Sequence, residues 1–207
     1  MTEPTILIHG GAGTMHPDRL TPERRTAILQ GLRRALTAGQ SVLRDDGSAI
    51  EAVVAAVPSL EDDPNFNAGR GAVFTSADLI EMDAAIMDGR SGRLGAVAGI
   101  LGPRNPVRAA QYIMQHSPHV LLAGPSALDL LRAAGLPFET LDYFATEERR
   151  TALDLFLTRS APADDFDRHG TVGAVALDAA GALAAATSTG GMTGKQPGRI
   201  GDSPIAG

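Results

Sequence analysis

A threonine directly follows a glycine at Gly170-Thr171, and more hydroxyl side chains cluster in the stretch Thr187-Ser188-Thr189. A threonine hydroxyl is a poor nucleophile unless a base removes its proton. A threonine at the start of a chain can use its own α-amino group, which titrates near ~7.7–8.0 and is substantially neutral at working pH. These residue types therefore indicate nucleophilic catalysis by a threonine that acts as its own base.

Thr171 lies inside the chain, so its amine must first be released. Attack of the Thr171 Oγ on the Gly170 carbonyl, followed by hydrolysis of the resulting ester, breaks the bond between the two residues. Glycine on the acyl side tolerates the strained geometry that this attack needs. Residues 143–169, just upstream, are rich in charges, Ala, Pro and Ser, which predicts a mobile linker or surface loop. We therefore expect cleavage at Gly170–Thr171, after which the linker moves away and opens the site.

The composition excludes several other kinds of function. The 207 residues include no cysteine, so there is no disulfide, thiolate metal site or cysteine nucleophile. The five histidines lack metal-ligand spacing, and the net charge of −6 argues against a general nucleic-acid binder. No membrane span or secretory leader is visible, so a cytoplasmic protein is expected. The glycine loop His9–Gly13 lacks the G-x-G-x-x-G order, which leaves nucleotide binding a weak alternative.

The first half of the chain carries helix signals that would position these groups. Thr21 is a candidate N-cap with proline at the next position, and Ser48 with Glu51 forms a capping box. Apolar residues then recur at helical spacing. The predicted helices run from Pro22 to about Arg44, from Ser48 to about Glu61, and from Asn105 through Met114.

Short apolar runs bounded by turn residues predict strands. Those at Val172–Asp178 and Ala182–Ser188 form the clearest hairpin, and they are apolar on nearly every residue, which is typical of strands covered on both faces. The fold class is therefore α/β, in a layered α+β arrangement of packed sheets with helices outside. The other predicted strands are Thr5–His9, Glu81–Met87 and Ala96–Leu101.

Five sequence blocks, in order and almost end to end, resemble the plant-type (type III) L-asparaginase and isoaspartyl peptidase family of N-terminal-nucleophile hydrolases. The Gly-Thr-Val-Gly-Ala-Val-Ala-Leu-Asp and Thr-Ser-Thr-Gly-Gly-Met-Thr stretches are the most specific. The resemblance implies an αββα sandwich, cleavage of L-asparagine or β-aspartyl dipeptides to release L-aspartate, and a homodimer of αβ units. The blocks are Ile8–Gly13, Phe66–Phe74, Met82–Ala84 with Met87–Gly89, Gly95–Gly99, and His169–Pro204.

The resemblance also implies roles for individual residues. Thr171 is the nucleophile with its freed amine as base, Thr189 supports its activation, and Asn67 lies close to it. Arg199 holds the substrate α-carboxylate and Asp202 its α-ammonium. This agrees with chemistry, because a guanidinium matches a carboxylate in bidentate fashion and a carboxylate pairs with an ammonium. On spacing alone, Arg199 and Asp202 would instead be read as a surface ion pair.

The loop from Leu60 to Arg70 matches the family's sodium-binding loop, and no organic cofactor is expected. Backbone carbonyl oxygens suit a hard cation. The alternative is a loop that simply ends a helix before Pro64, and the two interpretations are compatible. The carbonyl ligands implied are those of Leu60, Glu61, Asp63, Phe66, Ala68 and Arg70.

The resemblance divides the chain into an α-subunit region, residues 1–170, and the start of a β-subunit, residues 171–207. Family members continue beyond this point with further strands and a Thr-Gly-rich segment that lines the oxyanion hole. We therefore expect an incomplete sandwich whose apolar strands lie bare. An inactive remnant that serves only for binding or assembly is the alternative, and within the family a glycosylasparaginase or a protein-cleaving threonine protease stays open.

Overall fold

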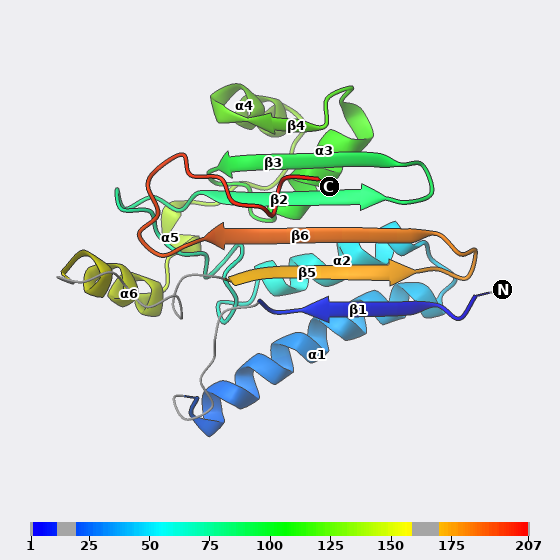
Figure 1. The fold of residues 1–207 in the computed structure, drawn as a ribbon, viewed down its shortest axis with the longest axis horizontal. Helices are drawn as coiled ribbons and strands as arrows, with labels where there is room; N and C mark the ends of the chain where they lie inside the picture. Colours follow the sequence, from blue (N-terminus) through cyan, green and yellow to red (C-terminus); the bar gives the residue numbers. More distant parts are fainter. Residues whose placement is uncertain (1, 12–19, 159–169, 207) are drawn as a thin grey trace.

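The computed structural model describes residues 2–11, 20–158 and 170–206 and contains one six-stranded sheet (Figure 1). The strand order is β1-β5-β6-β2-β3-β4, and neighbours are antiparallel except for the parallel pair β3 and β4. The strands are β1 (Thr5–His9), β2 (Met82–Asp88), β3 (Arg93–Ile100), β4 (Leu121–Ala123), β5 (Gly170–Leu177) and β6 (Leu183–Gly191).

The helices follow the predicted order in the first half of the chain and continue beyond it. The described residues contain no helix with the length and apolar character needed to span a membrane. The helices are α1 (Pro22–Arg44), α2 (Ala49–Glu61), α3 (Pro106–His116), α4 (Gly124–Ala133), α5 (Leu141–Phe144) and α6 (Glu147–Thr158).

The predicted helix starts are confirmed. The Thr21 side chain accepts a hydrogen bond from the Arg24 N–H, with Pro22 at the first helical position of α1. The capping box of α2 forms in both directions between Ser48 and Glu51. Each cap satisfies backbone donors that the first helical turn cannot pair internally.

Helices α1, α2 and α3 pack against one face of the sheet and form the core with it. Buried side chains of the central strands, including Val172, Ala174 and Ala186, join residues of these helices in a single apolar cluster. The buried side chains that β5 and β6 contribute to this cluster are alanine and valine, so this part of the core is packed from small aliphatic groups, in line with an aromatic content of 4%. The fold is thus a mixed α/β arrangement of a sheet layer and a helix layer.

The opposite face of the sheet, called here the open face, is apolar and partly exposed. Its strands place Leu7 opposite Val175, and Ala185 between Val175 and Met87. The exposed fractions are 65% for Leu7, 47% for Val175 and 44% for Met87. Among the described residues, therefore, β5 and β6 are not covered on both faces as their composition indicated, and the expectation of bare apolar strands is the one confirmed.

The segment predicted as a linker or loop, residues 143–169, differs in its first part. Residues 147–158 form helix α6, which lies near the ends of β5 and β6 (Figure 1). The Arg24 guanidinium in α1 makes two hydrogen bonds to the Glu148 carboxylate at 2.5 and 2.6 Å. Charged composition led to the loop interpretation, but some of these charges attach a short helix to the rest of the chain: Arg149 donates to the Gly71 carbonyl at 2.7 Å and Arg150 lies over the Phe74 ring. Residues 159–169 lie outside the described residues.

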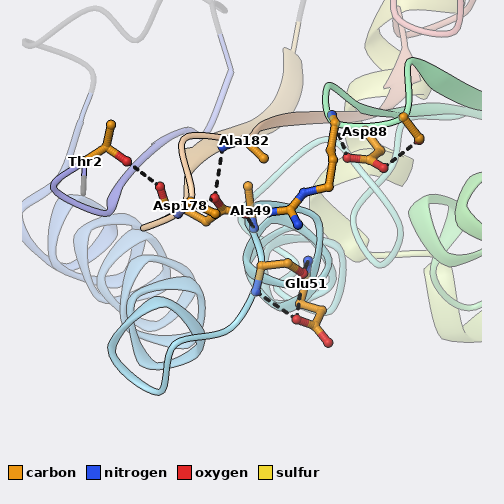
Figure 2. Close-up of polar contacts among 10 residues, drawn as sticks. Thr2, Ala49, Glu51, Asp88, Asp178 and Ala182 are labelled. Carbon is orange, nitrogen blue, oxygen red and sulfur yellow. Dashed lines mark hydrogen bonds and ion pairs between the residues drawn. The ribbon is translucent and has the colours of Figure 1, made fainter.

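The turn between β5 and β6 joins strands to helices at the other end of the sheet (Figure 2). The Asp178 carboxylate accepts hydrogen bonds from Ala180 N and Ala182 N within the turn and from Ala49 N at the start of α2. Arg90, from the β2–β3 turn, adds an ion pair at 3.3 Å. This carboxylate therefore anchors the turn of the β5–β6 hairpin, whose first strand carries Thr171.

Candidate active site

Thr171 is the second residue of β5, at a point where the pairing of β5 with β6 is irregular. Gly170 pairs with Gly191 and Val172 with Ser188, so the register shifts across Thr171. An irregularity of this kind redirects a side chain, and bulges are common next to active sites. The Thr171 side chain is half-buried and lines a cavity of about 860 Å³ on the open face.

The carbonyl oxygen of Gly170, immediately before Thr171, accepts two side-chain hydrogen bonds. Thr189 Oγ1 donates to it at 2.6 Å and Asn67 Nδ2 donates at 3.1 Å. The Thr189 oxygen also accepts from Gly191 N at 2.9 Å, which leaves its own proton for the Gly170 carbonyl. Two donors on one peptide carbonyl polarise it toward nucleophilic attack.

Asn67 is held so that its amide nitrogen faces this carbonyl. Its Oδ1 accepts from Val73 N at 3.0 Å, and its backbone oxygen accepts from Gly190 N at 2.9 Å. Its Nδ2 also donates to the Gly191 carbonyl at 2.7 Å. With the amide oxygen occupied by a backbone donor, the NH₂ group is left to face Gly170. The loop after α2 is thereby attached to the end of β6.

The glycine loop after β1 packs on the same peptide. Gly11 has φ 121°, and a Cβ at this position would come within 3.3 Å of the Gly170 Cα. The backbone of the loop therefore approaches the Gly170–Thr171 bond more closely than a larger residue would permit. Ala12 and Gly13, the rest of the loop, lie outside the described residues.

Arg199 and Asp202 lie on the segment that follows β6. Arg199 is half-buried beside Gly191 and Gly201, whereas Asp202 is exposed and lines the same cavity as Thr171. Within the part of the chain that the structure describes, these two side chains form no ion pair with each other. The ion-pair interpretation of their spacing therefore has no support, and both charges stay available to a ligand.

A buried lysine fixes this segment against the sheet. Lys195 Nζ donates to the Glu81 carbonyl at 2.8 Å, and the Glu81 carboxylate accepts from Gly198 N at 2.8 Å. Burial lowers the pKa of Lys195, while the negative charges of Asp83 and Glu81 oppose that effect. No local motif predicts this contact, because Lys195 and Glu81 are 114 residues apart.

Ser203 contacts Thr171, and the sequence motifs did not single it out. Its Oγ lies 3.1 Å from Thr171 Oγ1, and its carbonyl accepts from Thr187 Oγ1 at 2.9 Å. It belongs to the matching block His169–Pro204, but nothing in that block specifies which hydroxyl meets Thr171. A chain reversal after β6 brings the two together.

In the loop from Leu60 to Arg70, several backbone carbonyl oxygens lie close to Gly69 and Gly71. A Cβ at Gly69, which has φ 53°, would collide with the Glu61 carbonyl oxygen, and one at Gly71, with φ 109°, would collide with those of Pro64 and Phe66. Only glycine permits this curl, which gathers several carbonyl oxygens in one short loop. The described residues hold no cluster of three His, Cys, Asp or Glu side chains suited to a metal.

Two carboxylates brace this loop. Glu61 is fully buried, and its Oε1 accepts from Val107 N in the first turn of α3 at 2.9 Å. Burial raises the pKa of Glu61 to about 8. Asp63 accepts from Asn65 N at 3.0 Å and from Arg34 in α1 at 2.6 Å. The loop is thus tied to two helices.

Comparisons with known proteins find similar sequences along the whole chain. The family described as Asparaginase matches residues 2–207. An isoaspartyl peptidase of Salmonella typhimurium is 44% identical over 215 residues, which cover 100% of this chain and 69% of that protein. An isoaspartyl peptidase/L-asparaginase of Bos taurus is 41% identical and one of Homo sapiens 42% identical, each match covering 99% of this chain and 66% of the relative.

The chain thus spans about two thirds of the length of these relatives. The resemblance inferred from the sequence blocks is confirmed by a match over nearly every residue. The chain therefore belongs to the asparaginase family.

Proposed function

We propose that the protein is a self-processing threonine amidohydrolase that cleaves L-asparagine, β-aspartyl dipeptides or both, with release of L-aspartate. The relatives named above are isoaspartyl peptidases and isoaspartyl peptidase/L-asparaginases. The observation that carries the proposal is the Gly170 carbonyl, which accepts hydrogen bonds from Thr189 and Asn67 directly before the hydroxyl of Thr171.

Self-processing begins at that carbonyl. Thr171 Oγ attacks the Gly170 carbon, and negative charge develops on the carbonyl oxygen, where the Thr189 hydroxyl and the Asn67 amide stabilise it. The C–N bond then breaks and leaves an ester between the two residues. Water hydrolyses the ester, which gives a Gly170 carboxylate and a Thr171 with a free amine and hydroxyl. The products are residues 1–170 and the part that starts at Thr171.

The freed amine then serves as the base for the Thr171 hydroxyl in the second reaction. A substrate amide carbon takes the place that the Gly170 carbon held, with the Thr189 and Asn67 side chains nearby. Arg199 binds the substrate α-carboxylate and Asp202 the α-ammonium, which selects an amino-acid head group. The unpaired charges of both side chains and the cavity that Asp202 shares with Thr171 support this assignment.

Two measurements on the chain test the proposal. Denaturing mass spectrometry is expected to show the 1–170 fragment in wild-type protein and an uncut chain in Thr171→Ala. Release of ammonia from L-asparagine, or of aspartate from a β-aspartyl dipeptide, is expected only from cleaved protein. An intact wild-type chain that releases neither product after long incubation contradicts the proposal and supports the inactive binding module.

We further propose that the Leu60–Arg70 loop binds sodium through its carbonyl oxygens. The Glu61 carbonyl accepts the Arg70 N–H and the Asp63 carbonyl accepts the Phe66 N–H, and a carbonyl oxygen with two lone pairs keeps one for a cation. Sodium would hold the loop that carries Asn67. Replacing sodium with choline at constant ionic strength should lower the melting temperature by a few degrees, in line with loss of a weakly bound ligand. An unchanged melting temperature contradicts sodium binding.

A homodimer of αβ units and a cytoplasmic location also stay predictions from the sequence.

A further inference from the structure

The unprocessed chain leaves Thr171 without the base that the mature enzyme would use. Before cleavage, the nitrogen of Thr171 belongs to a peptide bond, and a peptide nitrogen cannot take the hydroxyl proton. Thr189 and Asn67 both contact the Gly170 carbonyl oxygen rather than the Thr171 hydroxyl. Self-cleavage therefore requires another group at Thr171 Oγ.

Ser203 is that group in the structure. Its Oγ lies 3.1 Å from Thr171 Oγ1, and either oxygen can donate. Across the described residues, it is the one hydrogen-bond partner of the Thr171 hydroxyl. A serine hydroxyl both accepts and donates, so it can receive one proton while releasing another.

The backbone around Ser203 is anchored, which fixes the hydroxyl relative to the sheet. Thr187 on β6 donates to the Ser203 carbonyl at 2.9 Å. Ile205 N closes a turn on the Asp202 carbonyl at 2.9 Å, and Pro204 between them is buried. Ser203 thus contacts Thr171 from a turn that is hydrogen-bonded to β6. With its backbone held, the Ser203 hydroxyl can change position only by rotation about χ1.

We propose that Ser203 is a catalytic residue of self-cleavage, whose hydroxyl orients Thr171 Oγ toward the Gly170 carbon and relays its proton. As the Oγ–C bond forms, the Thr171 proton passes to Ser203, and the Ser203 proton passes through water to the Thr171 nitrogen as the C–N bond breaks. The net change is one proton moved from oxygen to nitrogen, with no added reactant. The water that carries the proton is not consumed in this step, and a water molecule is consumed only afterwards, when the ester is hydrolysed. The inference rests on the proposed self-processing and adds the group that starts it.

The test compares two side chains of the same shape at position 203. Ser203→Thr adds a methyl group and keeps the hydroxyl. Ser203→Val adds the same methyl group but replaces the hydroxyl with a second methyl group of similar size. Self-cleavage of freshly made full chain is followed by denaturing mass spectrometry. Ser203→Thr is expected to stay within several-fold of wild type, whereas Ser203→Val and Ser203→Ala should be slower by about 10- to 100-fold, within the usual range of proton-transfer contributions.

A pH profile separates a proton relay from a packing role. Without the relay, hydroxide must take the Thr171 proton, so the cleavage rate of Ser203→Ala should rise about tenfold per pH unit, more steeply than that of wild type. Ser126→Ala, which removes an exposed hydroxyl on α4, is the matched control and should cleave as wild type does. Melting temperatures of all variants show whether each is folded.

Two outcomes overturn the inference. One is cleavage of Ser203→Ala at the wild-type rate with the wild-type pH profile. The other is equal slowing of Ser203→Thr and Ser203→Val with equal loss of melting temperature, which assigns the effect to packing. If wild type itself stays uncut at Gly170–Thr171, the proposed self-processing fails together with the inference, whereas a Ser203 result alone leaves the function standing.

Discussion

At the scale of single residues, the candidate site is a set of short-side-chain donors around one peptide bond. Thr189, Asn67 and Ser203 come from a strand, a loop and a turn, and each makes a side-chain hydrogen bond to the Gly170–Thr171 unit. None of them carries a formal charge. The chemistry therefore depends on where hydrogen-bond donors lie relative to the carbonyl, since fixed dipoles aimed at a developing charge need no reorganisation.

Thr189 offers a direct test of carbonyl polarisation. Its hydroxyl makes the shorter of the two hydrogen bonds to the Gly170 oxygen, at 2.6 Å, and it is buried. Thr189→Val keeps the shape and removes the donor, so we expect self-cleavage to slow by about 10²–10³-fold, the usual effect of losing one oxyanion donor. Thr189→Ser keeps the hydroxyl and should stay within about tenfold of wild type. Denaturing mass spectrometry gives both rates, and equal rates for Val and Ser would show that the hydroxyl does not matter.

The sequence predicted residue types better than residue partners. Thr171, Thr189 and Asn67 were found through motif blocks, and the structure brings all three to the Gly170 carbonyl. Ser203 and Lys195 were not found, because a contact between residues 32 or 114 positions apart depends on how the chain returns across the sheet. Physical reasoning from Arg199 and Asp202 alone favoured a surface ion pair, which the described side chains do not form.

At the scale of secondary structure, local signals were sufficient where a side chain acts on its own backbone. The Ser48–Glu51 capping box and the Thr21–Pro22 start fixed α2 and α1 to within a residue. Local signals did not predict α6. Leu153 is the one buried residue of this helix, so the helix has almost no repeating pattern of apolar core positions. Local signals also failed to assign faces to β5, because apolar residues occur on both sides of that strand: Val172 is buried, whereas Val175 is 47% exposed.

Asp178 holds the β5–β6 turn to other elements, and its ionisation makes the stability of the folded chain depend on pH. Its carboxylate joins the β5–β6 turn to α2 and to Arg90 (Figure 2). Hydrogen bonds from Ala182 N, then from Ala49 N, together with the Arg90 charge, hold the pKa of Asp178 below its usual value. A lowered folded-state pKa gives stability that is present above the unfolded-state pKa of about 3.9 and is lost as the pH falls through the folded-state value.

We therefore expect Asp178→Asn to destabilise the chain at pH 7 and to matter progressively less as the solution is acidified below about pH 4. In the carboxylate, one oxygen accepts from Ala182 N and the other from Ala49 N. An amide has only one acceptor oxygen, so its NH₂ group would face one of these backbone N–H groups. The loss at pH 7 should be about 1.5–3 kcal/mol, as for hydrogen bonds to charged groups. Urea unfolding from pH 3 to 7 measures it. Asp129→Asn, at an exposed position on α4, is the control, and its free energy of unfolding should hardly differ from that of wild type. If the loss of unfolding free energy in Asp178→Asn is the same at every pH, then the Asp178 carboxylate is not the source of the pH dependence.

At the scale of the whole molecule, the sheet has one face built as a core and one that is only partly covered. The core face meets α1, α2 and α3, while on the open face the segment after β6 passes in front of β2 in Figure 1, and its residues Asp202 and Ser203 line the same cavity as Thr171. Leu7, Val175 and Leu183 remain more than 45% exposed beyond that segment. Contiguous apolar surface of this kind is unusual on a monomeric soluble protein. The same substitution on the two faces of one strand should therefore destabilise the chain to very different extents.

Adjacent residues of β5 make that comparison with matched backbone surroundings. Ala174 is 3% exposed and points into the helix layer, whereas Val175 is 47% exposed and points to the open face. Ala174→Lys places an ammonium in a packed apolar core and should cost at least about 4 kcal/mol, enough to unfold much of the chain at 37 °C. Val175→Lys should cost less than about 1 kcal/mol, mostly through lower strand propensity, and should reduce binding of the dye ANS by shrinking the apolar patch. Urea midpoints and ANS fluorescence of the two variants report these effects. If Val175→Lys proves as destabilising as Ala174→Lys, then the open face is covered in solution, and the layer that covers it contributes as much to stability as the helices do.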